Sequence, residues 1–156
     1  MKLDPFEAVA VLLKGAFRVG APVDDVFPLF SPLGEKSWVP NWDPELLYPR
    51  GASWAQGMIF RTAGERGDAI WLVSRLDLDA HEVEYRRVEA GRYVVRVSVR
   101  CTADGAGGTT VGTEYEFVGL SESGNAEIAA MTQDGYAQKM HQWAAWIQQH
   151  LETLRG

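Results

Sequence analysis

The sequence predicts an α+β fold in which a curved antiparallel sheet of about seven strands wraps around one long C-terminal helix, with two short helices after the first strand. Two patterns predict it. Between residues 46 and 120, short segments of alternating apolar and polar residues are separated by Gly, Asp and Asn, as in hairpin-connected strands. From Asn125 onward the apolar residues recur at spacings of three and four, the period of an amphipathic helix. Such a helix can cover the apolar face of the sheet.

The composition is that of a folded domain. The chain has 156 residues, of which 46% are hydrophobic and 23% charged, so we expect a single domain over residues 1–156 with a core of its own. The single cysteine excludes an intramolecular disulfide and a zinc site built from several cysteines. Six Trp, five Tyr and six Phe form the most distinctive part of the composition.

The N-terminal residues and the lack of a long apolar stretch favour a cytoplasmic protein. No signal-peptide pattern and no stretch of about 20 apolar residues is present. A net charge of −6 argues against nucleic acid as a partner. Arg96 and Arg100 share one strand face, opposite Val97, and we interpret that face as solvated and paired with glutamates of neighbouring strands. The oligomeric state does not follow from the sequence.

The first third of the chain predicts a strand and two short helices. Residues 11–19 partly alternate and form the first strand. Asp24 can cap a short helix that follows, with Pro28 tolerated in its first turn. Residues 35–38 can form one further turn before Pro40.

Six more segments have the composition of strands. They are residues 46–49, 57–63, 69–78, 82–89, 92–103 and 109–120. In the last three, apolar and aromatic residues share one face and charged residues the other, so consecutive antiparallel pairing gives a sheet with one face to cover.

A regular apolar stripe begins after Asn125 and continues through the final helix. It consists of Ile128, Thr132, Tyr136, Met140, Trp143, Ile147, Leu151 and Leu154. The opposite, polar face carries Gln138, Gln142, Gln149 and Glu152. We expect Thr132 to cap this helix, and a shorter helical turn to precede it after Ser121 or Ser123.

This order of elements, together with several short motifs, resembles the START/Bet v 1-like superfamily, also called the helix-grip or SRPBCC fold. The resemblance covers nearly the whole chain, from about Gly15 to Leu154. The motifs that carry it are the strand Phe17-Arg18-Val19 leading into residues 21–27, the Trp- and Pro-containing segment 34–44, residues 57–62 and 71–75, and Gly124-Asn125. The opening and the segment 34–44 are similar to polyketide cyclase/dehydrase-like proteins of an uncharacterised bacterial branch.

The resemblance implies a cavity between the concave face of the sheet and the long helix, with the short helices at its entrance. The residue pattern agrees, because pockets combine apolar walls with a few polar groups that orient a ligand. The candidate ligand-binding residues are Trp38, Trp42, Phe60, Trp71, Tyr85, Tyr93, Tyr115, Tyr136, Met140 and Trp143. Trp54 and Trp146 are predicted to be peripheral.

Several candidates have an alternative interpretation. Trp38 and Trp42 either contact the ligand or plug one end of the sheet. Phe60 and Trp71 either line the cavity or belong to an ordinary core. A carboxyl at Glu35, beside a Trp, could have a raised pKa and act as a general acid or base, or it could be exposed or paired with an arginine.

The remaining polar residues give no standard catalytic assembly. His141 and His150 are nine residues apart and share no metal-ligand spacing, so no metal site and no cofactor are predicted. Cys101 lies on the apolar strand face and is expected to be a buried hydrophobic residue. Arg61 and Arg75 are expected to pair with acidic side chains.

Three functions therefore compete. The first is binding of a small hydrophobic or aromatic ligand, lipid- or polyketide-like. The second is an enzyme of the cyclase/dehydratase kind that uses the same cavity to fold a flexible substrate. The third is an interaction protein whose working surface includes Arg96 and Arg100.

Overall fold

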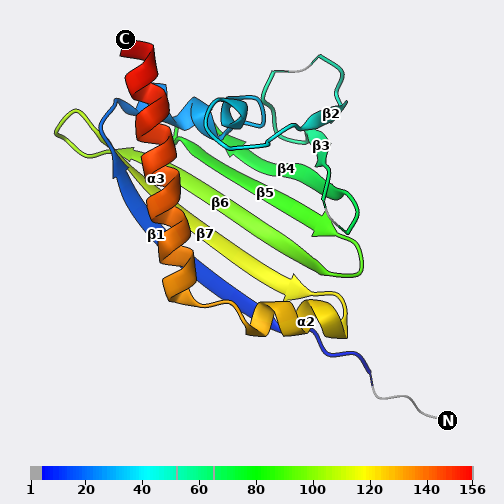
Figure 1. Ribbon diagram of the computed structural model, residues 1–156. Coiled ribbons are helices and arrows are strands. Elements are labelled where there is room, and N and C mark those ends of the chain that lie inside the picture. The colour runs from blue at the N-terminus through cyan, green and yellow to red at the C-terminus, as the bar shows by residue number, and fades with distance from the viewer. Residues whose placement is uncertain (1–4, 52, 65, 156) are drawn as a thin grey trace.

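A seven-stranded antiparallel sheet and a long C-terminal helix dominate the computed structural model, which describes residues 5–51, 53–64 and 66–155 (Figure 1). The strands are β1 (Ala10–Val19), β2 (Glu45–Tyr48), β3 (Ile59–Thr62), β4 (Ala69–Asp77), β5 (Glu82–Glu89), β6 (Tyr93–Ala103) and β7 (Thr109–Gly119). The helices are α1 (Val23–Val26), α2 (Glu122–Ala129) and α3 (Gln133–Arg155), with 3₁₀ turns η1 (Phe27–Phe30) and η2 (Gly34–Ser37). The predicted fold class is confirmed.

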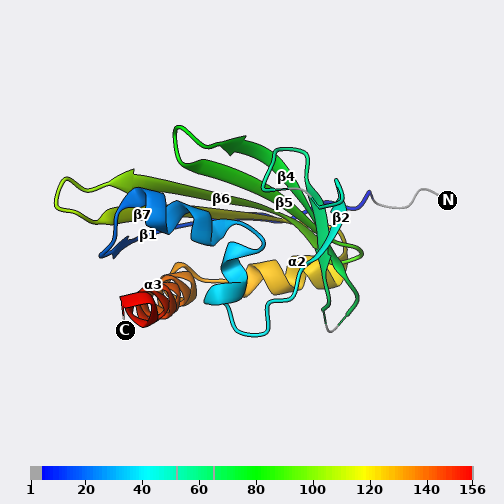
Figure 2. The ribbon, with the colours of Figure 1, turned by 90° about the horizontal axis from the view of Figure 1, so that it is seen from above.

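The sheet has the order β1-β7-β6-β5-β4-β3-β2. From β2 to β7, strands that follow one another in the sequence are also neighbours in the sheet. β1 instead pairs with β7, and the segment with α1, η1 and η2 carries the chain from β1 at one edge of the sheet to β2 at the other. The helices α2 and α3 lie on the same side of the sheet (Figure 2). The apolar face predicted from the alternation is this covered face, since Val95, Val97 and Val99 are buried while Arg96 and Arg100 lie on the other side.

One predicted cap is wrong. Asp24 lies within α1, whose N-terminal cap is Pro22 and receives no side-chain hydrogen bond. The Pro22 carbonyl accepts the amides of Asp25 and Val26 instead. The Asp24 carboxylate points to His81, whose Nε2 lies 3.1 Å from Oδ1.

The long helix packs tightly against β1 because a glycine lies between them. A Cβ on Gly15 would stand only 2.8 Å from Cγ of Met140, so a larger residue would push the helix away. Beside this contact, the hydroxyls of Thr113 and Tyr136 are 2.5 Å apart, and the Thr113 hydroxyl lies 3.0 Å from the Met140 sulfur. As predicted, Thr132 caps the helix by accepting the Gly135 amide at 3.0 Å.

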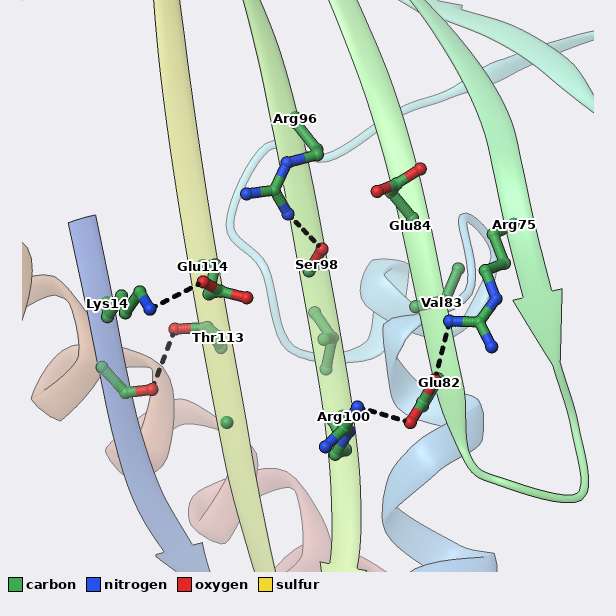
Figure 3. A pocket seen from close by; sticks show the side chains of 13 residues that line it. Lys14, Arg75, Glu82, Val83, Glu84, Arg96, Ser98, Arg100, Thr113 and Glu114 are labelled. Atoms are coloured by element: carbon green, nitrogen blue, oxygen red, sulfur yellow. Dashed lines mark hydrogen bonds and ion pairs between the residues drawn. The ribbon is translucent and has the colours of Figure 1, made fainter. Parts of the chain in front are cut away.

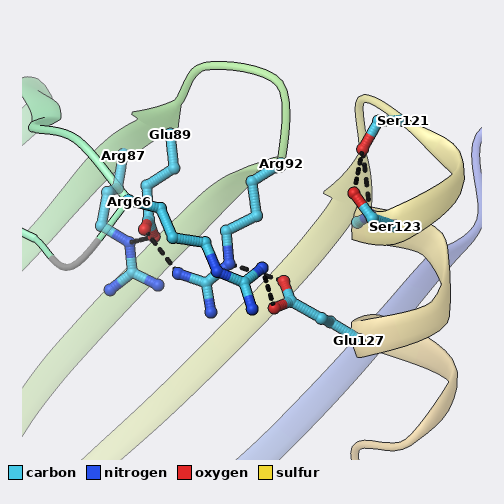
Figure 4. Close-up of polar contacts among 8 residues, drawn as sticks. Arg66, Arg87, Glu89, Arg92, Ser121, Ser123 and Glu127 are labelled. Atoms are coloured by element: carbon cyan, nitrogen blue, oxygen red, sulfur yellow. Dashed lines mark hydrogen bonds and ion pairs between the residues drawn. The ribbon is translucent and has the colours of Figure 1, made fainter.

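The short helix α2 is fixed by a cap and a network of ion pairs. Ser121 accepts the amide of Gly124 at 3.0 Å, which confirms the predicted helical turn. The Glu127 carboxylate forms ion pairs with Arg66 at 2.7 Å and with Arg92 at 2.5 Å, and Arg92 also forms an ion pair with Glu89 at 2.8 Å (Figure 4). This network joins α2 to the end of β5, to the turn before β6 and to the loop before β4.

The outer face of the sheet is charged and internally paired. A shallow depression of about 490 Å³ crosses it, lined by cations and carboxylates of neighbouring strands (Figure 3). Glu82 lies 2.8 Å from Arg100 and 2.9 Å from Arg75, and Lys14 lies 3.4 Å from Glu114. The prediction of a solvated face with cross-strand glutamate partners is confirmed, as is the pairing of Arg75.

Candidate ligand-binding cavity

A second cavity, of about 320 Å³, lies on the covered face between the sheet, η2 and α3. Its wall is formed by Pro32, Glu35, Val39, Trp42, Phe60, Trp71, Tyr85, Arg87, Val97, Val99, Tyr115, Lys139, Gln142, Trp143 and Trp146. It is smaller than the outer depression, but its aromatic walls and few polar groups are those of a small-molecule site. The outer depression, by contrast, is bordered by charges that already neutralise one another.

Stacked and edge-on rings form the wall on the β3–β5 side. Phe60 and Trp71 stack with centroids 5.4 Å apart and planes within 10°. Trp42 meets Trp71 edge-on at 5.5 Å, and Tyr85 meets Trp71 edge-on at 6.0 Å. Each indole nitrogen here has a partner: Trp42 donates to the Pro32 carbonyl at 2.7 Å and Trp71 to the Thr62 hydroxyl at 3.0 Å. These bonds fix the ring orientations, so this wall is preorganised.

Glu35 brings a carboxyl group to the cavity. It belongs to η2. At the start of this turn the Glu35 amide donates to the Ser31 carbonyl and the Lys36 amide to the Leu33 carbonyl. Its side chain forms no ion pair or hydrogen bond with any residue that the structure describes. Burial raises the pKa of Glu35 well above its usual value, and the charge of Lys139 opposes this only in part. The alternative interpretation, an exposed carboxyl or one paired with an arginine, is wrong, because Glu35 is only partly exposed and has no ion-pair partner among the described residues.

Two cations share the cavity with Glu35. The Lys139 ammonium lies 4.7 Å from the centroid of Tyr115 and 5.5 Å from that of Trp143. Although much of the Lys139 side chain is exposed, desolvation at these rings and the nearby charge of Arg87 lower its pKa to about 8. The Arg87 guanidinium lies 5.1 Å above the Trp71 ring.

The two tyrosines of the cavity have different environments. The Tyr85 hydroxyl donates to the Phe30 carbonyl at 2.7 Å, so it holds η1 against the sheet. The Tyr115 hydroxyl has no hydrogen-bond partner among residues 5–51, 53–64 and 66–155. Burial raises the pKa of both, so both stay neutral at physiological pH. Tyr115 is thus the free donor of the pair.

Six of the ten predicted ligand-binding residues come together in this wall. They are Trp42, Phe60, Trp71, Tyr85, Tyr115 and Trp143. Trp38 stands behind it: it packs edge-on against Phe30 and Trp143, is 6% exposed, and donates to the Leu29 carbonyl at 2.8 Å. Of the two interpretations of the Trp pair, Trp38 has the position of a plug and Trp42 that of a cavity wall.

The other three predicted residues lie elsewhere. Tyr93 packs against Phe117 and borders a neighbouring depression. Tyr136 and Met140 are in the tight contact of α3 with β1 and β7. Whether any of the ten contacts a ligand remains a prediction.

The sequence interpretation missed eight residues of the wall, and four of these bring a polar group or an indole ring to it. Trp146, expected to be peripheral, and Gln142, expected on the solvent face, both line the cavity, as do Arg87 and Lys139. Two signals could have found them. Arg87 follows Tyr85 by two residues on the same strand face, and Lys139 lies one helical turn before Trp143.

Comparison with solved structures identifies the fold. Norcoclaurine synthase from Thalictrum flavum, solved with a transition-state analogue, superposes with a TM-score of 0.70 over 97% of this chain and 100% of its own, at 13% identity. The chain has the Bet v 1-like, or helix-grip, fold. Ara h 8.0201 matches with a TM-score of 0.68 over 93% of this chain and 99% of its own, at 15% identity. An uncharacterised protein of Rhizobium leguminosarum reaches 0.61 over 94% and 97%, at 16% identity.

Sequence comparisons add nothing to this. No protein-family model matches this chain, and no curated protein matches it in sequence.

The described helices include none that is long and apolar enough to span a bilayer. Within the same residues, no three His, Cys, Asp or Glu side chains gather as metal ligands would.

Proposed function

We propose that this protein binds a small hydrophobic or aromatic ligand, lipid- or polyketide-like, in the cavity between the sheet and α3. The observation that carries the proposal is a preorganised aromatic wall around about 320 Å³ of space. That volume lies at the lower end of typical small-molecule sites, about 300–1,000 Å³. Norcoclaurine synthase, which shares the fold, has been solved with dopamine and hydroxybenzaldehyde, two aromatic molecules of a size that such a cavity accepts.

The test uses a neutral fluorescent probe, N-phenyl-1-naphthylamine, whose emission rises in apolar surroundings. We expect saturable binding, with energy transfer from the tryptophans of the wall. Val97 lies in the wall, so Val97→Phe fills part of the cavity and should weaken binding at least about tenfold, the effect of roughly 1.4 kcal/mol.

The matched control is Val94→Phe, because Val94 lies on the same strand but on the opposite face of the sheet. It should leave the affinity within about twofold. Absence of saturable binding, or equal affinity in the two variants, would exclude the cavity as the binding site.

A second function, acid–base catalysis of the cyclase/dehydratase kind, is favoured by Glu35. A carboxyl group without a partner, whose pKa burial raises beside a cavity, is suited to donate a proton to a bound substrate. The cavity itself would fold a flexible substrate into a reactive geometry. A turnover that survives in Glu35→Gln would exclude Glu35 as the proton donor.

A further inference from the structure

The charged groups around the cavity do not balance. Three charged residues line it, Glu35, Arg87 and Lys139. Lys139 makes no ion pair within the described part of the chain. The protein as a whole carries a net charge of −6, so two cations at one apolar cavity are not the result of a generally basic surface.

Arg87 is only partly satisfied. Its Nε lies 3.1 Å from a carboxylate oxygen of Glu89, but the N–H does not point at that oxygen. The buried Nε–H is therefore without a hydrogen-bond acceptor among the described residues. Because that atom has almost no exposed surface, the groups of Arg87 left to meet a ligand are its terminal nitrogens, which hydrogen-bond to no described residue.

Glu35 can neutralise at most one of the two cations. Burial raises the pKa of its carboxyl group and favours the protonated form, which carries no charge and can donate a hydrogen bond. The cavity thus brings two cations to a single carboxyl group whose charged form is disfavoured by burial.

We propose, building on the proposed function, that the cavity selects aromatic ligands that carry an acidic group, with Lys139 and Arg87 as the ionic contacts. The anionic group, a carboxylate, sulfonate or ionised enol, lies between α3 and β5. The aromatic body then packs against Trp42 and Trp71. Arg87 and Lys139 come from opposite sides of the cavity and repel each other, so an anion between them relieves this repulsion as well.

The experiment compares two probes with the same ring system. One is N-phenyl-1-naphthylamine, which is neutral, and the other is 8-anilinonaphthalene-1-sulfonate, which adds a sulfonate. Because the probes differ in hydrophobicity, the informative quantity is the ratio of their affinities in each variant, as in a double-mutant cycle. Lys139→Met removes the ammonium from a largely exposed side chain and should not affect folding.

We expect Lys139→Met to reduce the preference for the sulfonate about tenfold, as for one charge-assisted contact of roughly 1.4 kcal/mol. The control is Lys36→Met, because Lys36 is an exposed neighbour of Glu35 that does not line the cavity. It should leave the ratio within about twofold. An unchanged ratio in Lys139→Met overturns the proposal, and so does an equal fall in Lys36→Met, which would indicate general attraction to surface lysines.

The pH dependence gives a second readout. The sulfonate stays ionised, while Lys139, whose pKa is about 8, loses its charge between pH 7 and pH 9. Ionisation of Glu35 acts in the same direction, whereas Tyr85 and Tyr115, whose pKa values burial raises, stay neutral. The preference for the sulfonate should therefore fall as the pH rises, and a constant or rising preference contradicts the proposal. Binding of the neutral probe without any charge preference refutes this inference alone, whereas failure of both probes refutes the proposed function too.

Discussion

Gly124 is the position where a single added methyl group should do most damage to the fold. It lies in the first turn of α2, against the turn between β5 and β6. A Cβ there would stand 1.7 Å from the backbone oxygen of Arg92, and Cβ atoms in proteins essentially never come closer than 3.0 Å. Since the obstacle is a backbone carbonyl that also accepts the Leu120 amide at 3.0 Å, α2 must move by about 1.3 Å.

The magnitude follows from two opposing effects. Overpacking of a well-packed contact costs about 1–3 kcal/mol of unfolding free energy. Because the obstacle at Gly124 is rigid backbone, we expect the steric cost of Gly124→Ala to be about 3 kcal/mol. Replacing Gly by Ala within a helix returns about 1 kcal/mol. The expected net loss of unfolding free energy is about 2 kcal/mol, which for a chain of this length lowers Tm by about 4–8 °C.

The assay is thermal unfolding followed by circular dichroism, and the chain offers a matched control. Gly135 has the same place in α3 that Gly124 has in α2, because Thr132 accepts its amide as Ser121 accepts that of Gly124. A Cβ on Gly135 meets only the Thr132 hydroxyl at 3.1 Å. Gly135→Ala should therefore leave Tm unchanged or raise it slightly. Equal shifts in the two variants, or a Gly124→Ala protein as stable as the parent, would refute the reasoning.

Two further predictions concern buried groups. The pKa of Glu35 is higher in the folded than in the unfolded state, so the folded state loses stability as the pH rises from the unfolded-state pKa through the folded-state pKa. Glu35→Gln should therefore raise Tm at pH 7.5 and have little effect at pH 4. A lower Tm at pH 7.5 would contradict this. Cys101 is 2% exposed, and burial raises the pKa of its thiol to about 12. The thiol should therefore react with dithionitrobenzoate at pH 8 at least about 100-fold more slowly than free cysteine. Equal rates would show that the reagent reaches Cys101 freely.

Much of the sheet could be predicted because its signals are local. The predicted segment 82–89 coincides with β5, and those at 92–103 and 109–120 exceed β6 and β7 by one residue. Alternation along each strand also predicted which residues face the core and which face the solvent. This assignment is specific, because a shift of one residue would place every side chain of a strand on the opposite face. The wrong cap at Asp24 is local too, but there a histidine distant in sequence, His81, competes for the carboxylate.

A cavity between the sheet and the helix was implied by the resemblance, but which residues of α3 line it could not be predicted, because that depends on how closely the helix approaches the sheet. One stripe of α3 was expected to face the sheet. In the structure two stripes face inward: Tyr136, Met140, Ile147 and Leu151 are buried, while Lys139, Gln142, Trp143 and Trp146 line the cavity. The second stripe contains Lys139 and Gln142, so its polarity resembles that of a solvent-facing side.

Gly15 explains why the first stripe is packed and the second is not. The absence of a side chain at Gly15 lets Met140 and Tyr136 approach β1 closely, which seats this side of α3 on β1. The side of the helix facing β4 to β6 has no such close approach, and Trp42, Trp71 and Trp143 surround the space that remains. A Gly15 substituent would lift the helix and alter the cavity and the packed contact together. The cavity is therefore a consequence of where α3 is seated, and the same seating brings Lys139 of the helix to the cavity that Arg87 of the sheet also lines.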